Sequence, residues 1–364
     1  MQLPERKISA QSKVTLRRVL PLPGEVLVQR GQQVEALTVV ARAHAPHRYR
    51  LINVARQLGQ PQVEMEQVML KAEGDAVKAH EVIARVQGGL SFLQRAARAP
   101  TAGQIAAIGP GWVLLETESA LVELPAFING IIARVIPDRG VVIEASGAVI
   151  EAACGFGGET YGPLKRLVNN SSDILGHEAI DENLRNMIIL AGRSLDEETL
   201  RQAEAAQVRG VIVGSIDTAL LNLDPPVKVR VVATEGFGDI PMSPYTFGIL
   251  GTLDGKEVSI RGHTPHLAPL PGQTQADSQP IIMATSNKAS ALAALSAEKG
   301  SSSVLAVGSR VRVTAGQYLG ASGTIATLPP QPRASASGLV APGAIVNLGE
   351  ASPYIPLANL EQVV

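Results

Sequence analysis

The 364-residue chain has little cysteine, little charge and few aromatic residues. Cys154 is its only cysteine, so the chain can form no intrachain disulfide and no multi-cysteine metal site. Charged residues make up 18% of the chain, against about 25% in an average soluble domain. Aromatic residues make up 3%. The cores must therefore be aliphatic, built from Val, Ile, Leu and Ala.

Positive and negative charges nearly balance each other, and the chain lacks long apolar runs. Lys and Arg total 32 and Asp and Glu total 33, which leaves a net charge of −1 and no global field to attract nucleic acid or an anionic membrane. No apolar run reaches the roughly 18 residues of a membrane-spanning helix. The first residues are polar, unlike a secretory signal. We expect a cytoplasmic protein with no membrane insertion.

An internal repeat is the clearest pattern that is present. Residues 31–42 and 74–85 share the pattern G-x-x-V-x-A-x-x-V-[VI]-A-R, and a β-like segment precedes each copy. The glycine permits a tight turn, because a positive φ strains it little. The two copies predict the halves of one pseudo-symmetric β body, and two unrelated hairpins are the alternative. Between the copies, residues 48–58 predict one or two helical turns.

The repeat and the segment A-P-x-x-G-x-[IV] at residues 99–105 together resemble the barrel-sandwich hybrid fold. That fold occurs in biotinyl and lipoyl carrier domains, in membrane-fusion adaptor proteins and in the Rnf complex C subunit, and the resemblance covers residues 20–145. Carrier domains modify a lysine at an exposed hairpin tip, whereas Lys71 lies just before the turn at Glu73 and Gly74. We therefore expect no biotin, lipoate or other cofactor.

The middle of the chain predicts a small α/β module with a parallel sheet. Strand-like runs lie at residues 186–190, 208–213, 227–233 and 257–261. Ser194 followed by Glu197 has the pattern of a capping box that begins a helix. A shorter helix is expected over residues 217–223. Strands that alternate with helices favour parallel pairing with right-handed connections.

The last part of the chain resembles a KOW motif in a small SH3-like barrel, as in ribosomal proteins and NusG-type transcription factors. Glycines punctuate the apolar residues of 307–325, and closing strands are expected at 343–348 and 355–361. Gln317 stands where such modules often have a basic residue. The predicted fold is thus multidomain and β-rich, with a barrel-sandwich hybrid module over 1–168, an α/β parallel-sheet module over 169–262, a linker and helix over 263–303, and an SH3-like (KOW) barrel over 304–364.

Two groups of residues are candidates for binding. The first is a glycine-rich turn between a predicted strand and helix, where backbone N–H groups can hold a ligand; a purely structural turn is the alternative. Its residues are Thr234, Glu235, Gly236, Gly238 and Asp239. The second group would contact a partner or nucleic acid, with a solvated surface as the alternative. Its residues are Arg42, Arg48, Arg310, Arg312 and Tyr318.

No linked catalytic constellation is visible in the sequence. Nothing ties a histidine base to Cys154, and His263 with His266 lacks a third ligand at suitable spacing, so neither a catalytic nor a metal site is expected. The first hypothesis is therefore a non-enzymatic scaffold or adaptor that binds a protein partner. The alternatives are a nucleic-acid-associated KOW factor and a small-ligand-binding or enzymatic α/β module.

Overall fold

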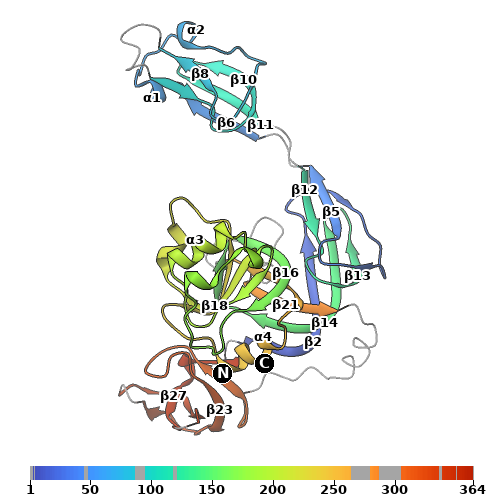
Figure 1. The fold of residues 1–364 in the computed structure, drawn as a ribbon, viewed down its shortest axis with the longest axis vertical. Helices are drawn as coiled ribbons and strands as arrows, with labels where there is room; N and C mark the ends of the chain where they lie inside the picture. The colour runs from blue at the N-terminus through green and yellow to red at the C-terminus, as the bar shows by residue number, and fades with distance from the viewer. Residues whose placement is uncertain are drawn as a thin grey trace. The chain divides into compact units, whose positions relative to one another are not determined.

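The computed structural model describes residues 3, 5–44, 48–86, 95–117, 121–263, 279–286, 305–335, 338–349 and 351–363. The chain divides into two compact units (Figure 1). Unit 1 comprises residues 1–41 and 124–364, and unit 2 comprises residues 42–123, inserted between its two parts. Most of the predicted linker and helix, His266 included, lies outside the described residues. The β-rich, multi-sheet class predicted from the sequence is confirmed.

Unit 2 is a small β body with its own core. Its four-stranded sheet has the order β6-β11-β10-β7, and a second, two-stranded sheet pairs β8 with β9. Buried Ile52, Val77, Ile83, Ile105 and Leu115 join both sheets in one aliphatic core. The strands are β6 (Arg48–Asn53), β7 (Ala76–Val77), β8 (Val82–Arg85), β9 (Ala96–Arg98), β10 (Gly103–Gly109) and β11 (Trp112–Thr117), and the helices are α1 (Val54–Leu58) and α2 (Met65–Val68).

The first part of unit 1 contains a β body with the same strand order. Its larger layer runs β2-β14-β13-β4 and its smaller layer runs β12-β5-β3. Buried Val34, Val40, Ile132 and Ile143 fill the core of this body. The strands are β2 (Ile8–Val19), β3 (Glu25–Val26), β4 (Gln33–Val34), β5 (Val39–His44), β12 (Leu121–Pro125), β13 (Gly130–Ile136) and β14 (Gly140–Glu151).

The two repeat copies form corresponding turns in the two bodies. Gly31 donates its backbone N–H to Ile132 O at 2.7 Å, and Gly74 donates to Ile105 O at 2.8 Å. Leu27 N likewise donates to Val40 O, as Leu70 N does to Ile83 O, both at 2.9 Å. Every one of these donors is shifted by 43 residues between the copies, so one β body is inserted into another of the same design.

The expectation that the copies pair as halves of one body was wrong. β4 of the first copy pairs with β13, and β7 of the second pairs with β10. Each copy finds its partner hairpin later in the chain, which the repeat alone did not reveal. Glycine is required in the first strand of each hairpin, because a Cβ on Gly130 would lie 2.6 Å from Glu144 O of β14 and one on Gly103 would lie 2.3 Å from Glu116 O of β11.

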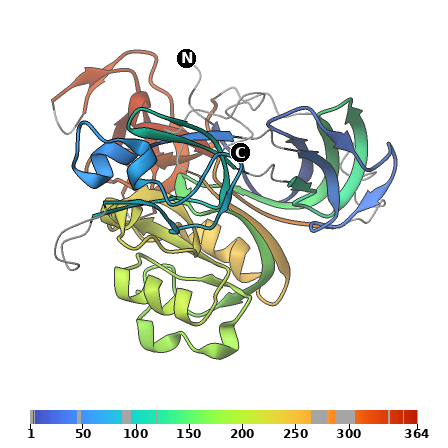
Figure 2. The same cartoon turned by 90° about the horizontal axis from the view of Figure 1, so that it is seen from above.

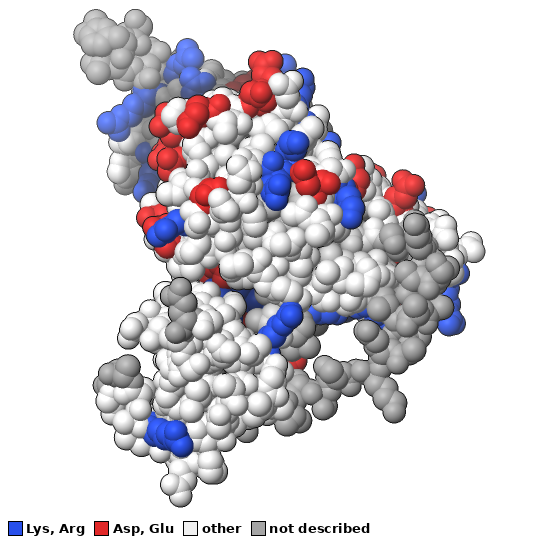
Figure 3. Space-filling model, turned by 60° about the horizontal axis from the view of Figure 1, so that its bottom comes forward, with Lys and Arg blue, Asp and Glu red and all other residues white. Residues whose placement is uncertain are grey.

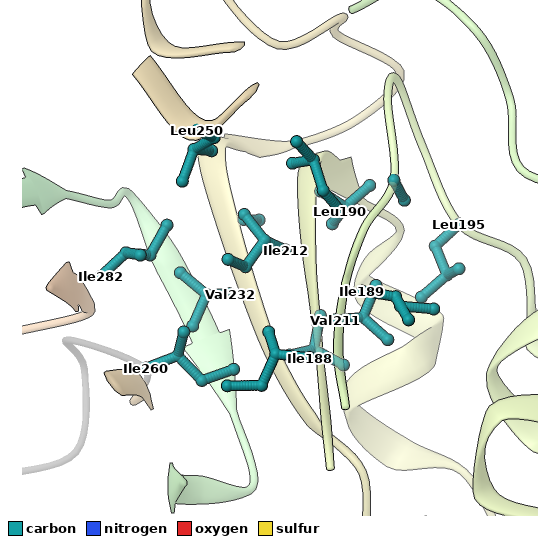
Figure 4. Packing of buried hydrophobic residues seen from close by; sticks show 14 of the residues in the cluster. Ile188, Ile189, Leu190, Leu195, Val211, Ile212, Val232, Leu250, Ile260 and Ile282 are labelled. Atoms are coloured by element: carbon teal, nitrogen blue, oxygen red, sulfur yellow. The ribbon is translucent and has the colours of Figure 1, made fainter. Parts of the chain in front are cut away.

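The α/β part of unit 1 has the parallel strands expected for residues 186–237. Strands β16, β17, β18 and β19 pair in parallel in that order, and α3 packs its buried Leu200 and Ala203 against them (Figure 1, Figure 2). Figure 4 shows Ile188, Ile212 and Val232 of neighbouring strands within this core. The bounds are β15 (Cys154–Phe156), β16 (Gly158–Arg166), β17 (Ile188–Leu190), α3 (Glu197–Ala205), β18 (Gly210–Ile216), β19 (Arg230–Phe237), α4 (Pro244–Gly251), β20 (Glu257–Gly262) and β21 (Ile281–Ser286).

Three local predictions differ from the structure. Helix α3 begins at Glu197 with Asp196 as its N-cap, because the Asp196 carboxylate accepts a hydrogen bond from Thr199 N at 2.8 Å; Ser194 does not cap it. The segment 48–58 is helical only in its second half, since β6 occupies residues 48–53 and Asn53 caps α1. The expected short helix over 217–223 is a 3₁₀ turn at Thr218–Asn222.

A buried ionic cluster joins the β body of unit 1 to the α/β part. Arg18 makes a bidentate pair with the Glu159 carboxylate at 2.7 and 2.8 Å, and Arg261 Nε reaches the same carboxylate at 2.8 Å. Both guanidinium groups lie over the ring of buried Phe127, 5.3 and 5.2 Å from its centroid. Phe127 has a left-handed backbone (φ 71°), which is strained for a residue with a side chain.

The C-terminal part of unit 1 is a six-stranded sheet with an aliphatic core. Its order is β1-β28-β22-β23-β26-β27, so strands from both chain ends lie side by side. Buried Val311, Ile325, Val346 and Leu360 form its core. The strands are β1 (Glu5–Arg6), β22 (Arg310–Val313), β23 (Ser322–Thr327), β26 (Gly343–Asn347), β27 (Tyr354–Pro356) and β28 (Leu360–Val363), and β24 (Arg333–Ala334) pairs with β25 (Val340–Ala341) beside them. Among the described residues, no helix is long and apolar enough to cross a bilayer.

Candidate functional site

A cavity of about 270 Å³ in unit 1 collects residues from both candidate groups. Glu235 comes from β19, Arg310 and Arg312 come from β22, and Arg6 comes from β1. The beginning of α4 adds Ser243 and Tyr245, and Ile8, Val311 and Val363 supply apolar walls. Residues distant in the sequence therefore meet here because the six-stranded sheet packs against the end of β19.

The deepest charged pair beside this cavity is Glu235 with Arg312. Arg312 Nε lies 2.6 Å from Glu235 Oε2, without the alignment of a hydrogen bond, and the two side chains are only 4% and 2% exposed. Arg312 Nη2 also donates to the Glu235 backbone carbonyl at 3.0 Å. Burial lowers the pKa of Arg312 below its ordinary value, and the neighbouring Glu235 and Glu361 oppose that shift.

Arg6 and Glu361 complete a four-charge network. Arg6 Nε pairs with Glu361 Oε1 at 2.9 Å, and Arg312 Nη1 lies 3.5 Å from Glu361 Oε2. Arg6 Nη1 also donates to the Thr234 carbonyl at 2.7 Å. Two guanidinium groups thus face two carboxylates, so the network is neutral and joins the six-stranded sheet to the end of β19.

Arg310 also lines this cavity, but its guanidinium contacts an aromatic ring. Its guanidinium stacks 4.4 Å from the centroid of the Tyr245 ring. Ser243 caps α4 by accepting a hydrogen bond from Thr246 N at 3.2 Å. A cation on an aromatic face beside a helix N-terminus gives this wall of the cavity a positive character.

The predicted ligand loop is divided between two environments. Thr234 and Glu235 are buried within β19, and the Glu235 carboxylate accepts a hydrogen bond from Ser243 N at 3.0 Å. Gly236 and Gly238 have left-handed backbones with φ of 119° and 113°. Asp239 forms a bidentate pair with Arg193 at 2.7 and 2.8 Å, which lowers the pKa of Asp239. Only Glu235 of the five residues lines the cavity.

The predicted contact residues are likewise not one patch. Arg310 and Arg312 share the cavity, but Arg312 is buried in the ion pair. Tyr318 is half-buried against the core of the six-stranded sheet. Arg42 is exposed in β5, and Arg48 lies in β6 with a side chain outside the described residues.

A larger groove of about 970 Å³ lies on unit 2. One side is α2 with the turn that follows it, and the other side is the end of β10. Half-buried Val63, Met65, Met69 and Ile108 pack on the core of unit 2 and form the floor. Leu70 beside them is 49% exposed, a large exposure for an apolar side chain.

The rim of this groove is acidic. Four carboxylates line it, and the lone cation of the lining, Lys71, pairs with Glu81 at 2.9 Å. The carboxylates belong to Glu64, Glu66, Glu73 and Asp75. Sequence reasoning missed all four. A comparison of the two copies could have found two of them, because Glu73 and Asp75 stand where the first copy has Arg30 and Gln32.

Within the part of the chain that the structure describes, we find neither an activated thiol nor a cluster of metal ligands. Burial raises the pKa of the Cys154 thiol to about 11, so the thiol is protonated at neutral pH. Within the described ranges, no three His, Cys, Asp or Glu side chains gather as metal ligands would. The cavity and the groove are thus suited to holding a ligand by charge and apolar contact.

The chain matches no protein-family model, and no curated protein matches it either.

Proposed function

We propose that this chain is a non-enzymatic adaptor that binds a partner protein through unit 2. The observation that carries the proposal is the apolar, acid-rimmed groove on an inserted β body that has its own core. A compact body inserted into a host of the same design leaves the host's core complete, so its surface is free to serve recognition. Apolar surface beside a polar rim is typical of protein-binding sites.

The proposal includes the type of each β part. We infer that the two nested bodies are barrel-sandwich hybrids and that the six-stranded C-terminal sheet is an SH3-like barrel. The shared strand order and the twin glycine turns support the first inference. The glycine-punctuated β22–β23 hairpin and the closing β28 support the second.

Affinity capture tests the adaptor proposal. The full chain and a variant in which a short glycine-serine linker replaces residues 44–121 are used as baits in native lysate of the source organism, with nuclease added. We expect a partner protein that the full chain retains and the variant loses. Retention of the same proteins by both baits would overturn the proposal that unit 2 carries the function.

The cavity of unit 1 supports a second candidate, the binding of a small organic acid. Arg310 on Tyr245 and the beginning of α4 provide its positive wall, and Ile8, Val311 and Val363 provide apolar contact. A thermal-shift screen of organic acids and nucleotides tests it, because a ligand of the folded state raises the melting temperature. An Arg310→Ala variant is expected to abolish any such shift.

The nucleic-acid alternative has less support. Residues 304–364 contain no lysine and three arginines, one of which is the buried Arg312. In Figure 3 the lobe that contains β23 and β27 is almost free of charged side chains. Phosphate recognition depends on a dense positive surface, so we expect no salt-dependent binding of RNA or DNA.

A further inference from the structure

We infer that the groove of unit 2 binds a basic segment of the partner protein that carries apolar residues on one face. This inference rests on the proposed adaptor function and names the class of partner. It is carried by three features of the described residues: the apolar floor, the acidic rim, and a difference between the two nested bodies.

The floor of the groove selects apolar side chains. Met65 and Met69 lie on it next to Val63 and Ile108, and Leu70 projects beside them. Methionine side chains are unbranched and adapt their shape to what they contact, so such a floor accepts leucine-like residues of varied geometry. A segment with apolar residues on one face, as on an amphipathic helix, buries them in such a groove.

The rim selects the charge of the segment. Carboxylates of Glu64, Glu66, Glu73 and Asp75 line the groove, and Lys71 is already paired with Glu81. Lysine and arginine on the polar face of a bound segment would meet these carboxylates, and complementary charge speeds association and orients the partner. Phosphates of nucleic acid and anionic lipid would be repelled.

The turn forms in unit 1 without acidic residues, although Glu73 in unit 2 also accepts a hydrogen bond from Ile108 N at 2.7 Å. Glu73 and Asp75 stand where unit 1 has Arg30 and Gln32, 43 residues earlier in the corresponding turn. The backbone role is kept, because Gln32 Oε1 accepts from Gln29 N at 3.0 Å as Asp75 Oδ2 accepts from Ala72 N at 2.8 Å. The negative charge is therefore particular to unit 2 and points to recognition.

A peptide-binding experiment on the full chain tests the inference. The probes are two labelled model peptides with leucine at helical spacing, one with lysine and the other with glutamate at the remaining positions. Fluorescence anisotropy is measured at low and at high salt. We expect the lysine peptide to bind, with affinity that falls as salt rises, and the glutamate peptide not to bind. Equal binding of both peptides would overturn the inference.

The two nested bodies supply a matched variant. The double substitution E73R/D75Q installs the residues that unit 1 has at the same turn. It removes the hydrogen bond from Ile108 N to Glu73 but keeps the turn, so it is expected to fold with a modest loss of stability, which the melting curve checks. Lysine-peptide affinity is expected to fall roughly tenfold or more, because two attractive charges are lost and one repulsive charge is added. The control Glu123→Lys changes a carboxylate of β12 that does not line the groove and should leave affinity within about twofold.

The outcomes separate this inference from the adaptor proposal. If E73R/D75Q binds the lysine peptide like the parent, or if Glu123→Lys weakens binding equally, the groove is not the site. If E73R/D75Q captures the partner as well as the parent does, but the variant without unit 2 does not capture it, the adaptor function stands and the inference is wrong. If E73R/D75Q and the apolar variant Leu70→Ser both weaken peptide and partner, the inference is supported.

Discussion

At the scale of single residues, the Glu235–Arg312 pair is the most deeply buried charge pair that we describe. Both side chains are almost fully removed from water, at 2% and 4% exposure. A buried charge that loses its partner destabilises a protein far more than the intact pair stabilises it, because the remaining charge is left without compensation. The stability of unit 1 therefore depends on both residues together.

Replacing Glu235 by glutamine tests this dependence. We expect Glu235→Gln to lower the free energy of unfolding by about 3–5 kcal/mol, since among the described residues Arg312 would keep the carboxylate of Glu361 at 3.5 Å and the backbone carbonyl of residue 235 but would lose its nearest carboxylate. Urea unfolding measures the change. Arg333→Ala, at an exposed position of β24, serves as the control and should change the free energy by less than about 0.5 kcal/mol. Equal unfolding midpoints for Glu235→Gln and the parent would contradict the expectation.

Glu159 gives unit 1 a stability that depends on pH. Burial alone would raise the pKa of Glu159, but the positive charges of Arg18 and Arg261 lower it. The resulting pKa lies below the ordinary value of 4.5. The unfolded chain then binds a proton more readily than the folded one, so this contribution is complete above pH 4.5 and declines as the pH falls through the folded pKa.

Melting temperatures from neutral to acidic pH measure this effect. The parent is expected to lose stability more steeply below pH 4.5 than Glu159→Gln, which is less stable at neutral pH but has no carboxylate to protonate. Glu178→Gln, at a side chain that is 76% exposed, is the control and should follow the parent curve. Parallel curves for the parent and Glu159→Gln would show that the cluster contributes nothing.

At the scale of elements, one glycine in each β body allows the two strands of its hairpin to lie close together. A Cβ at Gly103 would meet Glu116 O at 2.3 Å, and one at Gly130 would meet Glu144 O at 2.6 Å. Because both contacts are to backbone atoms, a new side chain cannot be accommodated by a rotamer change. The corresponding strands β10 and β13 would have to shift within their sheets.

We expect Gly103→Ala and Gly130→Ala each to destabilise its own body by about 1–3 kcal/mol, as overpacking does. Hydrogen exchange followed residue by residue distinguishes the two, since protection should fall in unit 2 for the first variant and in unit 1 for the second. Gly248→Ala, in α4 with open space around it, is the control and should be neutral or stabilising by up to about 1 kcal/mol. Uniform loss of protection in both units would contradict separate cores.

The sequence predicted the elements better than their partners. Apolar runs and glycines placed β17, β18, β19 and β20 near their observed positions, and the helix expected after the glycine-rich turn is α4. The repeat was real, but a pattern of glycine and valine describes a turn and does not say which later hairpin completes it. The cavity was beyond local reasoning, because Arg6, Glu235 and Arg312 meet through contacts between distant segments.

At the scale of the whole molecule, unit 2 has a hydrophobic core of its own, as an independently folding domain needs. Twelve of its described residues form one buried core, and they all lie between residues 52 and 115. We expect residues 42–123 expressed alone to fold and to unfold in one cooperative transition, which circular dichroism and the dispersion of amide NMR signals can measure. A matched peptide of residues 42–85, which lacks β10 and β11, should remain unfolded. Failure of the longer fragment to fold would mean that unit 2 depends on its host.

The nesting of one β body inside another also sets an order of events during synthesis. The outer body needs β13 and β14, which leave the ribosome only after the whole of residues 42–123 has been made. The inner body, in contrast, has all its strands once β11 has emerged. On a growing chain the guest can therefore close while β2 and β4 of the host still lack β14 and β13. We expect this head start to reduce the exchange of hairpins between two similar turns.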